Sequence, residues 1–267
     1  MSVRRRNNVS VHGTGSTTVV FAHGFGCDQA VWRFISPAFE ERYRILAFDL
    51  VGSGGSDLAA YDRARYGNLQ GYADDLLDIL DEFADGPVIH VGHSVSAMIG
   101  MLATIAAPGR FAAQAMIGPS PCYINDGDYV GGFSREDIGE LLDTMEANYL
   151  GWSRSLAPAI MGAPNRPELR QELTDSFCRN DPEIARHFAC VTFLSDHRPD
   201  VPKSTVPALV LQCSDDLIAP RTVGEWLHRH LPSSSLAVID NVGRCPHMSA
   251  PTASSRAIDV FLAQTLR

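Results

Sequence analysis

The chain of 267 residues has no apolar run long enough to span a membrane, so the sequence does not predict an integral membrane protein. A basic patch is also missing, and the net charge of −9 argues against a nucleic-acid-binding protein. The arginines at residues 4–6 are followed by asparagines rather than by an apolar stretch. This is not the pattern of a signal peptide, and we expect a solvated N-terminal tail there.

Closely spaced cysteines are absent as well. The six cysteines lie far apart, with no CxxC pair and no spacing typical of metal ligands. We therefore expect neither a disulfide framework nor a metal site, and a reduced, cytoplasmic environment fits the composition better. The glycine-rich stretch 51–56 has no GxGxxG register, so it does not predict a dinucleotide site.

Residues 88–100 have a strand-turn-helix pattern of a kind found at catalytic serines. Residues 88–91 form an apolar run of strand length, Gly92 interrupts it, and a run of small, helix-compatible residues follows. A serine at a turn between strand and helix is typical of a nucleophile elbow, and here it is Ser94. The usual pattern has glycine at the position of Ser96, so a serine in an ordinary turn is the alternative.

Strand and helix patterns alternate along most of the chain. We expect helices at 29–39 and 69–83, the second with a solvated acidic face, and strands at 9–11, 17–22, 44–49, 88–91, 115–117, 208–212 and 236–239. This alternation predicts an α/β fold with a mostly parallel sheet and helices on both faces.

The alternation stops between residues 123 and 199, where four helical segments follow one another without a strand. We therefore expect an α/β core formed by residues 1–122 and 200–267, with residues 123–199 inserted as a helical lid. The candidates to line a cavity below this lid are Trp152, Leu156, Phe177 and Phe193. The alternative is that these side chains only hold the lid helices together.

Three segments carry a resemblance to a known family. They are His23-Gly24-Phe25-Gly26-Cys27-Asp28-Gln29, Gly92-His93-Ser94-Val95-Ser96-Ala97-Met98-Ile99-Gly100 and Gly118-Pro119-Ser120-Pro121-Cys122-Tyr123. They resemble the RsbQ-type α/β hydrolases of bacteria and are similar to the plant karrikin and strigolactone receptor hydrolases. The likeness covers nearly the whole chain, including residues 131–133, 145–149 and 195–198. It implies the α/β-hydrolase fold, a Ser-His-Asp triad and a V-shaped lid of four helices.

The resemblance also implies which residues form two members of the triad. By position, Ser94 is the nucleophile, and Asp216, which precedes the stretch 217–220, is the acid. Asp215 is the neighbouring alternative for the acid.

The same resemblance implies an oxyanion hole formed by the backbone N–H groups of Phe25 and Val95. It places His93, next to Ser94, in the substrate pocket. His23 precedes the serine, which is the wrong chain order for the base, so we interpret it as a loop-shaping residue.

The base position departs from the family pattern. The family loop has Gly-His-x-Pro, whereas this chain has Gly243-Arg244-Cys245-Pro246, with Arg244 in the place of the histidine. A guanidinium is protonated at any working pH and cannot accept the serine proton. Near Asp216 it is expected to form an ion pair. His247 is the alternative base, although a structural loop histidine is the simpler interpretation.

Two functions of different classes follow. The first is a serine hydrolase of small apolar esters or lactones, with butenolide-like compounds among the candidate substrates, that needs no metal or organic cofactor and is impaired by Arg244. The second is a ligand-binding signalling protein with little turnover, for which the bacterial resemblance implies a stress-response phosphatase as partner. Ser94 excludes a haloalkane-type dehalogenase, which needs aspartate at the elbow, whereas a cofactor-free haloperoxidase-like activity would use the same triad.

Overall fold

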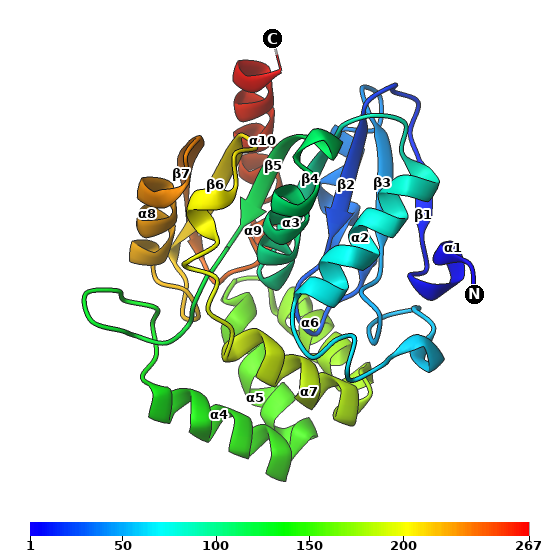
Figure 1. Ribbon diagram of the computed structural model, residues 1–267. Helices are drawn as coiled ribbons and strands as arrows, with labels where there is room; N and C mark the ends of the chain where they lie inside the picture. Colours follow the sequence, from blue (N-terminus) through cyan, green and yellow to red (C-terminus); the bar gives the residue numbers. More distant parts are fainter. Residues whose placement is uncertain (267) are drawn as a thin grey trace.

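The computed structural model describes residues 1–266. Its centre is a seven-stranded sheet with the order β1-β3-β2-β4-β5-β6-β7 (Figure 1). The strands are β1 (Ser10–His12), β2 (Thr18–Ala22), β3 (Arg44–Phe48), β4 (Val88–His93), β5 (Phe111–Ile117), β6 (Ala208–Asp215) and β7 (Ser234–Val242). Neighbouring strands pair in parallel except β1, which runs antiparallel to β3. The expected α/β fold with a mostly parallel sheet is confirmed.

Helices cover both faces of the sheet. One hydrophobic core contains residues of α2 (Gln70–Phe83), α3 (Val95–Ala106) and α8 (Arg221–His230). The other contains residues of the 3₁₀ helix η1 (Gln29–Phe34), α9 (Pro246–Ser249) and α10 (Pro251–Thr265). In β2, Val19 and Phe21 belong to one core and Val20 belongs to the other, because alternate strand residues face opposite sides. Such a strand is buried on both faces and therefore nearly all apolar.

Between β5 and β6 the chain forms four helices, which we call the helical layer. They are α4 (Arg135–Ala147), α5 (Tyr149–Met161), α6 (Pro167–Arg179) and α7 (Pro182–Phe193). Figure 1 shows them gathered at one end of the sheet. Within residues 1–266, no strand of the sheet lies between 135 and 194.

The helix boundaries in this layer have local causes. Ser134 caps α4 in a reciprocal capping box with Asp137, and the Asp181 carboxylate caps α7 by accepting from two backbone N–H groups. Both α6 and α7 begin with proline, which already has the φ of a helix and lacks an N–H that would be unsatisfied there. These signals are readable in the sequence, which is why the four segments were predictable.

The expected helix at residues 29–39 is instead two 3₁₀ segments, η1 and η2 (Ser36–Ala38). Pro37 lies in this stretch and has no N–H to continue an α-helical ladder. The prediction of a single helix was therefore wrong in type, although Val31 and Trp32 are buried, as a helix packed on the sheet would require.

The N-terminal residues are also more ordered than a solvated tail. Residues 3–6 form the short helix α1 (Val3–Arg6), and Arg6 Nη1 donates to Asp78 over 2.9 Å while its Nη2 lies 3.2 Å from Asp75. Asp75 is only 1% exposed and also accepts from the Tyr66 hydroxyl at 2.8 Å. Arg4 and Arg5 are exposed, as expected of a solvated tail, but Arg6 and Asp75 depart from the expected solvated tail and solvated acidic face of α2.

Candidate active site

Ser94 lies at a sharp turn between β4 and α3. Its φ is 57° and its ψ is −120°, a conformation that is strained for a residue other than glycine. The Ser94 N–H donates to Ile117 O of the neighbouring strand over 2.8 Å, and this bond holds the turn. A Cβ on Gly92 would lie 2.5 Å from Ser96 O, so strand and helix can approach this closely only with glycine there. This geometry is that of a nucleophile elbow.

Ser96, where the usual pattern has glycine, connects the elbow to the loop at residues 23–26. Its hydroxyl donates to His23 O over 2.5 Å. A Cβ on Gly24 would lie 3.2 Å from Ser94 Cβ, so this loop passes directly over the serine. The departure from the usual pattern therefore adds a hydrogen bond between α3 and the loop.

His23 shapes this loop, as expected. Its Nδ1 lies 2.9 Å from Gly24 O and its Nε2 accepts from Leu50 N–H over 3.0 Å. The same Nε2 lies 3.8 Å from Asp49 Oδ1, so the ring connects the loop to the end of β3. The side chain is fully buried and has no hydrogen bond to Ser94 in the described chain.

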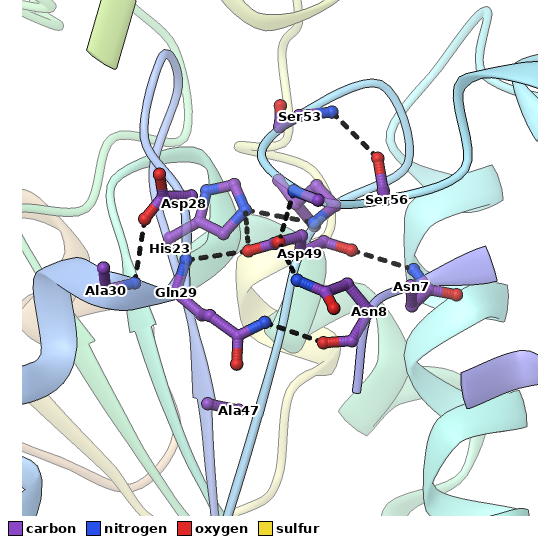
Figure 2. Close-up of polar contacts among 12 residues, drawn as sticks. Asn7, Asn8, His23, Asp28, Gln29, Ala30, Ala47, Asp49, Ser53 and Ser56 are labelled. Carbon is purple, nitrogen blue, oxygen red and sulfur yellow. Dashed lines mark hydrogen bonds and ion pairs between the residues drawn. The ribbon is translucent and has the colours of Figure 1, made fainter. Parts of the chain in front are cut away.

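Asp49, at the end of β3, anchors the chain that follows the loop (Figure 2). Its buried carboxylate accepts 2.8 Å hydrogen bonds from Gln29 N, from the Asn8 amide and from Gly55 N. Three donors satisfy the charge and fix the start of η1 relative to two other loops. The sequence analysis missed Asp49, since an aspartate after a strand has no distinguishing local pattern.

The backbone N–H groups of Phe25 and Val95 are the predicted donors of the oxyanion hole. In the part of the chain that is described, neither donates a turn or loop hydrogen bond. Val95 is the first residue of α3, where backbone N–H groups have no partner within the helix. The helix N-terminus also favours negative charge at this point.

Arg244 lies between Ser94 and Asp216. Its Nη2 donates to Ser94 Oγ over 3.2 Å and to Gly118 O over 2.5 Å. Its Nη1 lies 3.4 and 3.3 Å from the two carboxylate oxygens of Asp216. Asp216 Oδ1 also accepts from the N–H groups of Ile218 and Ala219, at 2.8 and 3.1 Å. The three side chains thus form a continuous polar chain in the order serine, arginine, aspartate.

The electrostatics of Arg244 prevent it from acting as a base. Burial alone would lower the pKa of the guanidinium, but the Asp216 carboxylate and neighbouring groups raise it above its ordinary value. Arg244 is 3% exposed and Asp216 is 7% exposed, so the pair is shielded from water. The guanidinium donates to the serine oxygen and offers no lone pair for its proton. Asp215, the alternative acid, has an exposed side chain. Its backbone O accepts a hydrogen bond from Gly243 N–H, next to Arg244.

His247 lies in different surroundings. It is 0% exposed, and its ring packs against Trp32 and His93, with centroid distances of 4.7 and 4.4 Å. Within the described chain neither ring nitrogen has a hydrogen-bond partner. Burial lowers the pKa of His247 to about 3. The structure therefore does not bring His247 into hydrogen-bond contact with Ser94 or Asp216.

A narrow cavity lies between Ser94 and the helical layer. It leaves about 30 Å³ for the centres of water-sized molecules, which is room for water but not for an ester. Of the predicted pocket residues, His93, Leu156, Phe177 and Phe193 line it. Residues that the sequence analysis did not predict also line it: Cys27, Tyr123, Ile160, Leu173, Thr192, Ile218 and Cys245.

Trp152 does not line this cavity. It stacks on Phe177, with ring centroids 6.1 Å apart, and it meets Phe25 edge-on at the same distance. On its other side it borders an open groove between α4 and α5, which Leu156 also lines. The expectation that Trp152 forms the cavity wall is thus not met in this arrangement, and Leu156 is the residue shared by groove and cavity.

Two further observations concern metal ions and membranes. Among residues 1–266, no group of three or more His, Cys, Asp or Glu side chains is arranged to hold a metal ion. No helix in this range combines the length and the apolar character needed to cross a membrane.

Comparison with known proteins agrees with this geometry. The profile of the Alpha/beta hydrolase family matches residues 19–257. A karrikin insensitive 2 receptor of Petunia hybrida is 40% identical over 93% of each chain. A strigolactone esterase of Pisum sativum is 37% identical over 96% of this chain and 97% of its own. A solved hydrolase from Oleispira antarctica superposes with a TM-score of 0.95 at 42% identity, covering 98% of this chain and 96% of that one.

Proposed function

Since this chain belongs to the α/β hydrolase family and is similar to the karrikin and strigolactone receptor esterases, we propose that it binds a small apolar ester or lactone at Ser94 and turns it over very slowly. The observation that carries this proposal is the guanidinium of Arg244 between Ser94 Oγ and Asp216. Ser94, Phe25 and Arg244 line a mostly apolar cavity, and Asp216 lies on the other side of Arg244. At the position proposed for the base, the guanidinium donates hydrogen bonds and cannot accept the serine proton.

The proposed roles follow from the geometry. The N–H groups of Phe25 and Val95 hold the carbonyl oxygen of the ligand, and Ser94 Oγ faces its carbonyl carbon. For the acyl bond to form, the serine proton must pass to a base. Arg244 instead donates to the lone pairs of the serine oxygen, so attack is slow, while the same positive charge favours ligands with a carbonyl or carboxylate.

We propose that residues 123–199 act as a lid. The cavity beneath the helical layer is too small for an ester, and we propose that these helices move when a ligand enters. Leu156 lines both the cavity and the open groove between α4 and α5, which makes that groove the entrance in our proposal.

The experiment is to measure binding and turnover separately. Calorimetry with 4-nitrophenyl acetate and γ-valerolactone gives affinity, and chromatography gives the product released by the parent and by Ser94→Ala. We expect binding by both proteins and a parent rate close to that of Ser94→Ala. Rapid turnover by the parent would contradict the proposal that Arg244 blocks the position of the base. If neither protein binds either probe, the proposed ligand site is wrong.

A second function, reception of a small ligand for signalling, is favoured by the same closed cavity. In this proposal a ligand that enters displaces helices of the helical layer, and a partner protein recognises the changed surface. The partner we propose is a cytoplasmic protein phosphatase, the one implied by the bacterial resemblance. Hydrogen exchange of α4–α7 with and without ligand tests this: faster exchange on binding supports it, and unchanged exchange contradicts it.

A further inference from the structure

Thr192, near the end of α7, is a buried polar residue whose hydroxyl finds no partner in residues 1–266. It is 2% exposed and lines the cavity above Ser94. Its hydroxyl oxygen has no hydrogen-bond partner among the described residues. A buried hydroxyl without a partner destabilises a fold, so its presence at a cavity wall calls for a partner from outside the chain.

Other buried threonines in helices of this protein do not share this property. The Thr104 hydroxyl in α3 donates to Met101 O over 2.7 Å, and the Thr174 hydroxyl in α6 donates to Arg170 O over 2.8 Å. Such bonds to a carbonyl of the preceding turn are the usual solution for a helical threonine. Thr192 makes no such bond, although valine would fill the same volume without the unsatisfied group.

The rest of the cavity defines what its ligand must look like. The wall is largely apolar, with Leu156, Phe177 and Phe193 contributed by the helical layer. Ser94 and Arg244 belong to the core, whereas Thr192 belongs to α7. A few polar groups in an apolar pocket set the orientation and identity of its ligand.

We propose that Thr192 determines specificity by binding a second oxygen of the ligand, in addition to the carbonyl at Ser94. The inference rests on the proposed function, and it narrows the ligand class to esters or lactones that carry a further hydroxyl or carbonyl group on their apolar part. A site built to hydrogen-bond such an oxygen disfavours the analogue that lacks it, because the hydroxyl is then buried unpaired.

The test uses probes that differ only in one oxygen. The 2-, 3- and 4-hydroxyphenyl acetates are compared with the three methylphenyl acetates, since hydroxyl and methyl groups have similar volumes. Dissociation constants are measured by calorimetry for the parent, Thr192→Val and Thr192→Ser. In the parent, we expect at least one hydroxyl isomer to bind about fivefold more tightly than its methyl counterpart, the worth of one ordinary hydrogen bond. Thr192→Val should lose this preference and Thr192→Ser should keep it.

Stability provides the matched control. Thr192→Val should raise the melting temperature of the ligand-free protein, because it removes an unsatisfied hydroxyl, whereas Thr104→Val should lower it by removing a hydrogen bond. A merely structural role for Thr192 would not change the preference for oxygen-bearing probes.

The outcomes separate this inference from the function on which it rests. Equal binding of both series to the parent, or a preference that persists in Thr192→Val, would overturn the role of Thr192 and leave the proposed site intact. Binding of neither series to any variant would overturn both.

Discussion

Arg244, in the loop after β7, and His247, in the short helix α9, are three residues apart and both buried, yet their surroundings are opposite. Arg244 meets a serine hydroxyl, a carbonyl and a carboxylate, while His247 meets aromatic rings and has no polar partner within the described chain. Both position and residue type therefore matter. His247 could accept a proton but has no contact with Ser94 or Asp216, whereas Arg244 lies between them and has no lone pair for a proton.

The largest expected effect comes from exchanging the side chain at position 244. Arg244→His should raise the rate of 4-nitrophenyl acetate hydrolysis by about a thousandfold or more over Arg244→Ala, because only histidine supplies a lone pair for the serine proton. Steady-state absorbance at fixed pH measures this. Similar rates for the two variants would show that the guanidinium obstructs the site without occupying the place of the base.

The next effect concerns the ion pair of Arg244 and Asp216. Asp216→Leu should lower the free energy of unfolding by about 3 kcal/mol, because it leaves a buried guanidinium that cannot lose its proton. Arg244→Met should cost about 1 kcal/mol, since Asp216 keeps two backbone N–H donors and a carboxyl group can become neutral. Urea denaturation measures both values, and equal costs would contradict this asymmetry.

Acid stability distinguishes His247 from an exposed histidine. Its pKa in the folded protein is about 3, below the ordinary value of 6.5. Between these values the unfolded chain binds a proton that the folded protein does not, so stability falls as the pH falls from 6.5 toward 3. His247→Leu should reduce this loss by roughly 1.4 kcal/mol per pH unit. Urea denaturation at pH 7, 6 and 5 tests the slope, and an unchanged slope would indicate that His247 is protonated in the folded state.

The smallest effect is expected at Ser96. Ser96→Ala removes the hydroxyl that donates to His23 O and should cost about 1 kcal/mol of stability. In an Arg244→His background it should also lower kcat with little change in KM, since the loop over Ser94 is then less firmly held. A change in KM alone would mean that Ser96 affects ligand entry rather than the oxyanion hole.

The sequence predicted the sheet and the four helices of the helical layer well, because both depend on local signals. Mostly apolar strand runs such as 17–22 and caps such as Ser134 and Asp181 are visible without knowledge of the fold. The elbow at Ser94 was visible for the same reason. Pro37 is also a local signal, because proline disfavours a continuous α-helix across residues 29–39, where the structure has two 3₁₀ segments.

The rest depended on contacts between distant segments. Asp75 looks like part of a solvated acidic face until Arg6 and Tyr66 are seen around it. Trp152 is a large aromatic residue of the kind that often lines a cavity. It stacks on Phe177 instead and does not line the cavity above Ser94. Thr192 appears in the sequence as an ordinary helical threonine, because nothing local indicates that its hydroxyl has no partner.

The most direct test of the central claim is the rate of 4-nitrophenyl acetate hydrolysis by the parent, Ser94→Ala and His247→Ala under identical conditions. If Arg244 occupies the place of the base and no other group replaces it, the three rates agree within about threefold, since loss of one triad member leaves little serine-dependent catalysis. A parent rate orders of magnitude above that of Ser94→Ala, which collapses in His247→Ala, would show a working triad through His247 and contradict the account.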